Sequence, residues 1–571
     1  MLKVSTLDSE NSGKEKIRID YSYMLKTMPL PFHPILFSIF PILFIFSNNT
    51  SHLSWEQIQG PTLWTLLVTA TVWFSLQLLY KNAHKAAIGT SWLVILFFSY
   101  GPAYDFLGDI QSTFQSHWLL LPLWLLSGTI GILALNRCNE TTKTLSHAAN
   151  WIALCLLGPS FLMLLTQSWV APVSLSMDTS LAMEKELPLP NVQYEKPNIF
   201  YIVLDAYGSQ PALQKYFDFD NKDFLDFLSK KGFQVNNQAK ANYNQTWLAL
   251  TSSLNLNYVQ EFLSDSALQT TSRQPLKHLI QNNVATNYLK QLGYSIICLQ
   301  SGLSFTSWND ADILAPPHKS FDEFFILWFS MTPIRGVFGI IDDITGSKHS
   351  PYQNLRERIQ FSFEHLPDYA NTLSPAFIFS HILAPHPPFV FGPNGEPIEP
   401  DRKYAIGDGS VFFANGGTKE EYKKNYIGEV QFINDQLKQT ITKILSHSKT
   451  PPIILIQADH GSRMNLDWES FANTDTEEAY SILHALYIPS HYRLVTPERI
   501  SPVNNFRILF NTLFHTHLNL LKHESYYSPW ENLFQFQPVH HKASNHFTTM
   551  PDTTSPGYLT HTSRQKSQID L

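Results

Sequence analysis

Five residues after position 200 carry side chains that bind metals, and they fall in three short stretches. Each stretch comes at the end of an apolar run, where ligand-binding residues of α/β proteins commonly lie. Two carboxylates and an imidazole brought to one place suit a divalent cation such as Zn²⁺ or Mn²⁺. Such a cation lowers the pKa of a hydroxyl and neutralises charge on a transferring phosphoryl group. The five residues are Asp205, His381, His386, Asp459 and His460.

Each stretch also has an ordinary structural interpretation. An aspartate before a glycine turn, such as Asp205, more often forms an Asx-turn than binds a ligand. His386 is flanked by prolines, which suits a rigid turn with a surface histidine. The run Asp459-His460-Gly461 fits a plain connection between a strand and a helix. The metal-site interpretation therefore requires the three stretches to converge at one edge of a sheet.

A threonine at the start of an apolar helical pattern is the candidate nucleophile. The stretch 242–253 is typical of a loop that runs into a helix, and Thr246 lies at the junction. The backbone N–H groups and the dipole at a helix N-terminus favour an anion. A hydroxyl placed there is well suited to attack a phosphate or sulfate ester. The alternative is an N-cap threonine, and position alone favours that alternative.

The elements that must position these residues alternate between strand and helix patterns. Continuous runs of β-branched and aromatic residues predict strands buried on both faces, as in a parallel sheet. Helical spacing followed by glycine predicts the intervening helices. The alternation indicates an α/β domain with a mostly parallel central sheet. The expected strands are 198–205, 233–236, 294–299, 376–381, 452–458 and 485–489, and the expected helices are 223–232, 284–292 and 422–445.

The N-terminal third contains five apolar segments in succession. A helix needs about 20 apolar residues to cross a bilayer. Five nearly uncharged runs are rare in a soluble fold, so we expect a bundle of about five transmembrane helices. The first segment is short and holds two prolines, which makes it the weakest of the five. The segments are Phe32–Ser47, Thr62–Tyr80, Ala86–Tyr104, Trp118–Asn136 and Asn150–Val170.

Lysine and arginine alternate between the connections of these segments. The N-terminal tail, the second loop (Lys81, Lys85) and the fourth loop (Arg137, Lys143) carry them, whereas the first and third loops have none. Basic loops stay on the cytoplasmic side of the membrane. The pattern therefore predicts a multi-pass protein of the cell inner (plasma) membrane. Its catalytic domain would be periplasmic or extracellular.

Composition limits the partners and sets the domain boundaries. The net charge of −7 over 571 residues argues against a nucleic-acid partner, which usually selects a basic surface. The three cysteines form no zinc-binding pattern and say nothing decisive about compartment. The expected organisation is a cytoplasmic tail (1–30), transmembrane helices (31–171), a linker (172–196), a catalytic domain (197–535) and a disordered tail (536–571).

Several segments, in their order and spacing, resemble the alkaline phosphatase/sulfatase superfamily. The likeness is closest to its membrane-bound sulfatase-like branch, which includes lipoteichoic acid synthases and phosphoethanolamine transferases. It spans roughly residues 195–530 and also fits the N-terminal helices. The segments that carry it are Asn198–Gly208, Tyr243–Leu254, Phe377–Phe391, Tyr422–Leu437, Ile453–Gly461 and Ile500–Phe506.

The resemblance implies roles for individual residues. In that branch an acid after the first strand, a threonine nucleophile and a late Asp-His pair hold one divalent metal ion. By this likeness the metal ligands are Asp205, Thr246, Asp459 and His460, with Thr246 as the catalytic nucleophile. The histidine that binds the substrate phosphate matches His386, and His381 is a weaker candidate. Arg463 lies just beyond the metal pair, where it either contacts an anionic substrate or is a surface arginine.

The sequence departs from the superfamily pattern in two places. Sulfatases carry Cys or Ser in a C/S-x-P-x-R motif, and the run from Thr246 to Leu250 does not match it. Ordinary sulfatase chemistry is therefore not expected. Alkaline phosphatases and phosphoglycerate mutases of this fold use two metals, whereas the ligands found here serve one.

Three functions remain open at this point. The leading hypothesis is a phosphotransferase that moves a phospholipid-headgroup phosphoryl group through Thr246 to an envelope glycan or lipid. The second is a hydrolase of phosphate or, less favoured, sulfate esters. The third is a non-catalytic envelope or polysaccharide-export protein that retains the fold. Membrane lipids are the expected partners in the leading hypothesis.

Overall fold

A computed structural model describes most of the chain, and all the elements below belong to the compact unit Met1–Val539. The predicted tails and the predicted linker fall mostly outside the described residues. Those residues are 30–50, 53, 55–110, 114–138, 141–169, 187, 195–262, 271–315, 323–345, 350–372, 375–400, 402, 404–492 and 500–541.

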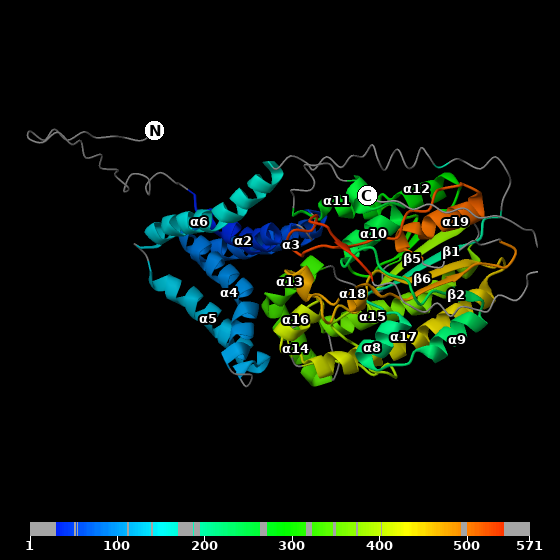
Figure 1. Ribbon diagram of the computed structural model, residues 1–571. Coiled ribbons are helices and arrows are strands. Elements are labelled where there is room, and N and C mark those ends of the chain that lie inside the picture. The colour runs from blue at the N-terminus through cyan, green and yellow to red at the C-terminus, as the bar shows by residue number, and fades with distance from the viewer. Residues whose placement is uncertain are drawn as a thin grey trace, which may run out of the picture. The chain divides into compact units, whose positions relative to one another are not determined.

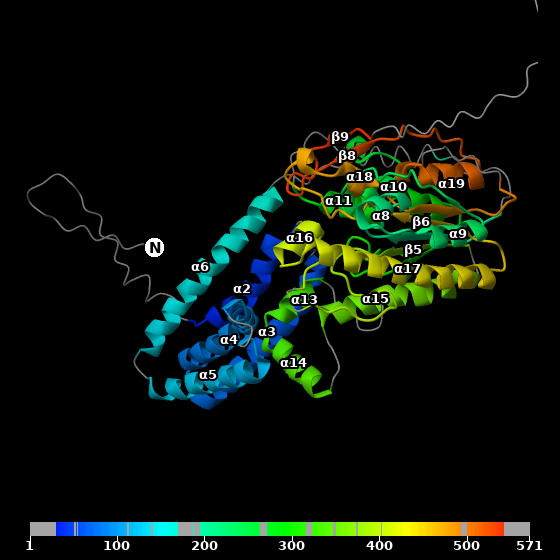
Figure 2. The same ribbon diagram turned by 60° about the horizontal axis from the view of Figure 1, so that its bottom comes forward.

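The five predicted N-terminal helices are confirmed (Figures 1 and 2). Four of them, α3 to α6, are long and apolar enough to cross a membrane. The first, α2, has 16 residues, and at 1.5 Å per residue it is about 24 Å long, somewhat less than the roughly 30 Å of a bilayer core. The bounds are α2 His33–Asn48, α3 Trp55–Tyr80, α4 Ala83–Ile110, α5 His117–Arg137 and α6 Thr142–Trp169.

The short helix α2 is bound to other helices at both of its ends. At its start, His33 Nδ1 lies 2.6 Å from Ser91 Oγ of α4, and the His33 amide donates to Asn150 Oδ1 of α6. Near its end, the ring of Phe46 lies 4.5 Å from the ring of Trp55 at the start of α3. α2 is therefore held against α4 and α6 at its start and against α3 at its end.

The second part of the chain folds around a seven-stranded sheet with helices on both faces (Figure 1). Six strands are parallel, and β7 is antiparallel to both of its neighbours. This confirms the predicted α/β domain with a mostly parallel sheet. In spatial order the strands are β2 Phe233–Val235, β7 His484–Tyr487, β6 Ile453–Ala458, β1 Ile199–Leu204, β5 Ala376–Ile382, β3 Ser295–Leu299 and β4 Ile313–Ala315.

The central strand β1 shows why its sequence is apolar without interruption. Phe200, Ile202 and Leu204 point into one core. Ile199 and every second residue after it in the strand point into the other. Side chains alternate between the faces of a strand, so a strand covered on both sides is apolar throughout. The first core is covered by α8 Gln210–Phe217, α9 Lys222–Lys230, α15 Pro351–His365 and α17 Lys419–His447, and the second by α10 Thr246–Leu254, α11 Gln274–Gln281, α12 Val284–Gln291 and α19 Asn505–Phe514.

The strand β4 and the helices α8, α11, α15 and α19 are not among the elements expected from the sequence, and neither are the remaining ones. They include a two-stranded antiparallel sheet whose second strand lies beyond the predicted domain end at residue 535. They also include a pair of apolar helices that follows β4. The bounds are α13 Glu323–Ser330, α14 Pro333–Thr345, α16 Gly409–Ala414, α18 Thr476–Tyr480, β8 Ser525–Tyr527 and β9 Gln537–Val539, with 3-10 turns at Val259–Phe262, Leu366–Asn371, Phe471–Asn473 and Pro502–Asn504.

Candidate metal centre

The three metal-binding stretches meet because their strands are neighbours at the centre of the sheet. β1 pairs with β6 on one side and with β5 on the other, and Leu204 is opposite both Ala458 and Ile382. Asp205 and Asp459 follow directly after β1 and β6, so both carboxylates leave the same edge of the sheet. The carboxyl ends of parallel strands are the usual position of ligand sites in open α/β sheets.

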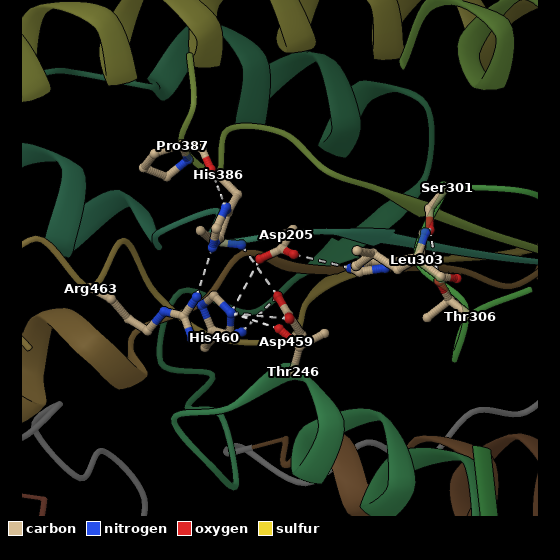
Figure 3. A network of polar contacts seen from close by, with 12 residues as sticks. Asp205, Thr246, Ser301, Leu303, Thr306, His386, Pro387, Asp459, His460 and Arg463 are labelled. Atoms are coloured by element: carbon tan, nitrogen blue, oxygen red, sulfur yellow. Dashed lines mark hydrogen bonds and ion pairs between the residues drawn. The ribbon is translucent and has the colours of Figure 1, made fainter. Parts of the chain in front are cut away.

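Three oxygen atoms surround one nitrogen of His460 (Figure 3). His460 Nε2 lies 3.1 Å from Thr246 Oγ1, 3.2 Å from Asp205 Oδ1 and 3.2 Å from Asp459 Oδ2. Ligand atoms of Asp205, Asp459 and His460 all lie within 4.8 Å of one another. All four side chains are buried, with Thr246 the most accessible at 9 % exposure.

This donor set fits a divalent cation better than it fits a set of protein hydrogen bonds. Asp205 Oδ1 and Asp459 Oδ2 are buried and accept no hydrogen bond. A single imidazole nitrogen carries at most one proton, so His460 Nε2 cannot satisfy three oxygens at once. Buried carboxylates without such partners are costly unless a cation neutralises them. The residues present therefore suit a divalent metal ion.

The surroundings of Asp205 keep it ionised. Burial alone would raise the pKa of Asp205, but the imidazoles of His386, His381 and His460 hold it well below its usual range. His381 lies within β5, and its Nε2 is 3.4 Å from Asp205 Oδ2. His381 and His460 therefore contact different oxygens of the Asp205 carboxylate. The other acid, Asp459, accepts hydrogen bonds from the amides of Ala206 and His460.

Thr246 is the first residue of α10, and Gln245 is the N-cap. The alternative interpretation of Thr246, an N-cap threonine, is therefore excluded. The threonine hydroxyl points instead toward His460 and the two carboxylates (Figure 3). The helix N-terminus adds its positive dipole end at this position. A hydroxyl next to a cation and a helix N-terminus is placed to lose its proton and attack an electrophile.

His386 and Arg463 form a second pair beside the centre. Arg463 Nη2 lies 2.8 Å from His386 Nε2, and Arg463 Nη1 donates to the carbonyl oxygen of Asn244 over 3.0 Å. Arg463 is only 5 % exposed, which excludes the surface arginine considered as an alternative. Burial lowers the pKa of His386. The negative charge of Asp205 acts in the opposite direction, and the positive charge of Arg463 lowers this pKa further. The pair brings one permanent positive charge close to the metal-binding residues.

Two tyrosines of α17 fix the loops that carry the two acids, and sequence reasoning did not single them out. The Tyr426 hydroxyl donates to the carbonyl oxygen of Ala206 and accepts from the amide of Gly208. The Tyr422 hydroxyl donates to the carbonyl oxygen of Ser462 over 2.6 Å. Residues four apart lie on one face of a helix, so α17 holds both loops from the same side. A tyrosine on an apolar helix face gives no sign of such a partner.

Two buried glutamates support the same region and were also missed. Glu478 accepts from the Ser462 hydroxyl and from the amides of Met464 and Asn465, which shapes the loop around Arg463. Glu429 of α17 accepts from two amides in the segment that follows His386. Burial raises the pKa of both carboxyls, that of Glu429 to about 8. Their roles depend on contacts across the fold, which local sequence does not reveal.

No family model matches the chain, and no curated protein sequence matches it. Solved structures do match. Its structural neighbours include phosphoethanolamine transferases and a sulfatase.

Three of these structures differ in how much of the chain they match. One is an integral membrane protein, the lipooligosaccharide phosphoethanolamine transferase EptA from Neisseria meningitidis. It is 10 % identical to this chain, the match covers 86 % of this chain and 94 % of the EptA chain, and the TM-score is 0.36. The periplasmic domain of EptC from Escherichia coli, in complex with Zn, is 15 % identical and covers 57 % and 86 %, with a TM-score of 0.35. The 2-O GAG sulfatase BT1596 is 15 % identical and covers 59 % and 78 %, with a TM-score of 0.38.

Proposed function

We propose that this protein is a membrane-anchored, metal-dependent phosphotransferase with Thr246 as its nucleophile. The observation that carries the proposal is the convergence of Thr246 Oγ1 with His460 Nε2 and with two buried carboxylate oxygens that accept no hydrogen bond, Asp205 Oδ1 and Asp459 Oδ2. A non-catalytic relative would have no need to keep a hydroxyl aimed at such a centre.

The metal would be held by Asp205, Asp459, His460 and the Thr246 oxygen. We propose one ion, Zn²⁺ or Mn²⁺, because the set mixes one imidazole with hard oxygen ligands. When bound, the ion neutralises negative charge and lowers the pKa of a coordinated hydroxyl. The positive charge of Arg463 lies beside this centre, so Arg463 and His386 are proposed to bind the phosphoryl oxygens of the substrate.

The proposed reaction has two displacements at phosphorus. In the first, Thr246 Oγ forms a bond to the phosphorus of a phospholipid headgroup, and the bond from phosphorus to the lipid alcohol breaks. The hydroxyl of Thr246 loses its proton, and the leaving alcohol gains one. In the second, a hydroxyl of an envelope glycan or lipid attacks the phospho-threonine, and Thr246 is regenerated. Water in place of this acceptor would make the enzyme a hydrolase.

Contacts within the chain support a lipid donor on the outer side of the membrane. The α/β domain contacts the two loops that lack basic residues, which the charge pattern places outside. Gln274 donates to the carbonyl oxygen of Thr50 in the first loop, and Arg335 pairs with Asp105 near the third. We propose an inner-membrane protein whose catalytic domain is periplasmic or extracellular.

The test uses the full chain in lipid vesicles and a phospholipid with a labelled headgroup. Wild-type protein should transfer label to an alcohol acceptor and carry label on Thr246 in the absence of acceptor. Thr246→Ala should do neither, while Thr251→Ala, a buried threonine of the same helix whose hydroxyl bonds only to the backbone of Trp247, should retain labelling. Release of free label regardless of acceptor would indicate a hydrolase. Normal transfer by Thr246→Ala would refute the nucleophile.

Metal analysis separates an enzyme from a non-catalytic protein of the same fold. We expect about one Zn²⁺ or Mn²⁺ per chain in the wild type and its loss in Asp459→Asn, because metal ligands must be ionised. Asp467→Asn is a matched control, since Asp467 comes eight residues later in the chain and accepts hydrogen bonds from the amides of a turn at the surface. Absence of stoichiometric metal from the wild type and from the Asp467→Asn control would favour the non-catalytic alternative.

A further inference from the structure

The helix pair α13–α14 is an unusual feature of the α/β domain because it is apolar on its outer surface. Leu327, Val337, Ile341 and Ile344 are 39 to 69 % exposed. The last three are spaced four and three residues apart, so they form one stripe along α14. Contiguous exposed apolar surface on a folded protein marks a site of contact with a protein or a membrane.

The inner side of the pair packs against the transmembrane helices. Phe324 and Trp328 share an apolar cluster with Phe46 of α2 and with Val94 and Phe98 of α4. At the turn between α13 and α14, the carbonyl oxygen of Met331 accepts from the amide of Gly101, 2.9 Å away. A methyl group at Gly101 would overlap with the carbonyl oxygen of Ser330. The approach of the two backbones therefore depends on a glycine in the middle of α4.

Polar contacts fix the depth of α14. Arg335 forms an ion pair of 2.8 Å with Asp105 near the end of α4, and its guanidinium lies 4.8 Å from the ring centre of Tyr104. The indole of Trp118, at the start of α5, donates to Asp343 over 2.9 Å. Tryptophan and charged residues at helix ends are typical of the membrane–water interface. α14 thus lies where α4 ends and α5 begins.

The chain path shows that the pair does not cross the membrane. Together α13 and α14 are apolar enough to count as one span, but they bend by 82° at their junction. The segment leaves the sheet after β4 and returns to it through α15 and β5. Both strands belong to one sheet, so both ends of the segment are on the same side of the bilayer. The segment must return to the side from which it came.

We propose that α13 and α14 form a re-entrant hairpin that enters the membrane from the side of the α/β domain, with Val337, Ile341 and Ile344 in contact with lipid acyl chains. α13 packs against α3 and α14 against α5, and both of these membrane-length helices carry exposed apolar side chains, which supports lipid rather than protein as the occupant of the stripe. The α/β domain is then attached to the bilayer by its own sequence as well as through α6. The inference is independent of the proposed enzyme chemistry.

Spin labels in the full chain, reconstituted in phospholipid vesicles, test the hairpin. Cys138 and Cys155 are replaced by alanine, whereas Cys298 is buried and can remain. Single labels are placed at Val337→Cys and Ile344→Cys. Collision with oxygen, which enters lipid, is compared with collision with a water-soluble nickel chelate. We expect frequent oxygen collisions and few chelate collisions at both positions.

Matched controls are apolar residues of similar exposure in known surroundings. Leu125→Cys on α5 represents lipid, and Ile406→Cys and Leu520→Cys, which are 42 and 43 % exposed, represent the α/β surface. Labels at 337 and 344 that behave like those at 406 and 520 would overturn the proposal. Protection from both reagents, with dipolar broadening that disappears when labelled protein is diluted with unlabelled protein, would show a second copy there and would also overturn it.

Discussion

The hydroxyl of Tyr426 donates a hydrogen bond to the carbonyl oxygen of Ala206, and the two oxygens lie 2.8 Å apart. Ala206 has a φ of 68°, a left-handed conformation that is strained for a residue with a side chain. It directly follows Asp205, so the hydrogen bond from Tyr426 holds the turn by which the chain leaves β1 next to this carboxylate. One side chain of α17 thereby fixes the backbone beside a proposed metal ligand that lies far away along the chain.

Removing this hydroxyl should weaken metal binding without unfolding the domain. We expect Tyr426→Phe to lower metal affinity about 10- to 100-fold, the usual effect of a lost group behind a metal ligand. Competition with a metal chelator measures the change. Tyr369→Phe is the control, because Tyr369 packs near the start of β1, at the end of the strand away from Asp205. Equal affinities in the two variants would contradict the role of Tyr426.

The glycine after His460 should not tolerate a side chain. A methyl group at Gly461 would overlap with the carbonyl oxygen of Glu478, whereas one at Gly208 would meet its nearest atom at an ordinary 3.5 Å. We expect Gly461→Ala to displace the His460 loop, abolish metal binding and cost about 1–3 kcal/mol of stability. Gly208→Ala should keep both properties. Metal content and unfolding midpoints distinguish the two, and a metal-replete Gly461→Ala would count against the geometry.

Arg463 should not be replaceable by lysine. Its guanidinium reaches the Asn244 carbonyl and His386 at the same time, and a single ammonium cannot reproduce that fork. Hydrogen bonds to a charged group contribute about 1.5–3 kcal/mol, so kcat/KM for headgroup transfer should fall roughly 10- to 100-fold in Arg463→Lys. Arg356→Lys, at a buried arginine bonded to the Ile398 carbonyl, controls for loss of stability. The prediction fails if both variants lose the same activity.

Glu429 should make the domain less stable as pH rises. Burial raises its pKa from 4.5 to about 8, although the amides of Val390 and Phe391 act in the opposite direction. Between pH 4.5 and about 8 the folded protein keeps a proton that the unfolded chain has released. Stability therefore falls with rising pH across this window. Glutamine accepts the same hydrogen bonds without titrating.

The measurement is the difference in unfolding midpoint between wild type and Glu429→Gln at pH 5.5 and at pH 8. We expect the unfolding midpoint of Glu429→Gln to be higher, relative to that of the wild type, at pH 8 than at pH 5.5. Glu420→Gln, on the exposed face of the same helix, should show no such trend. A difference that is the same at both pH values would mean that Glu429 does not keep its proton in the fold.

Residue pattern predicted the central sheet and the acids at its edge for a physical reason. Strands such as β1 and β6 are buried on both faces, so their sequences are apolar without interruption and end where the chain emerges from the core. An acid at that point, as at Asp205 and Asp459, is then visible as a candidate. Position alone favoured Thr246 as an N-cap threonine, and the resemblance favoured it as a nucleophile.

The unpredicted features depend on partners that lie far along the chain. The antiparallel direction of β7 is set by its pairing with β2 and β6, which its four residues do not encode. The apolar residues of α13 and α14 are interrupted by Thr332-Pro333, so neither helix reaches the length of a membrane span. The burial of Arg463 follows from contacts with Asn244 and His386, which no local pattern indicates.

The order of strands in the sheet has a consequence for biosynthesis. β6 lies between β1 and β7, and the amide of Ala206 is bonded to Asp459, 253 residues further on. A nascent chain that already contains β1, β5 and most of the helices still lacks the strand that completes the centre. Contacts between such distant segments form late in folding. Metal capture would then mark the chains that have finished assembling, and any truncation before β6 would leave a protein that is anchored but unable to retain the ion.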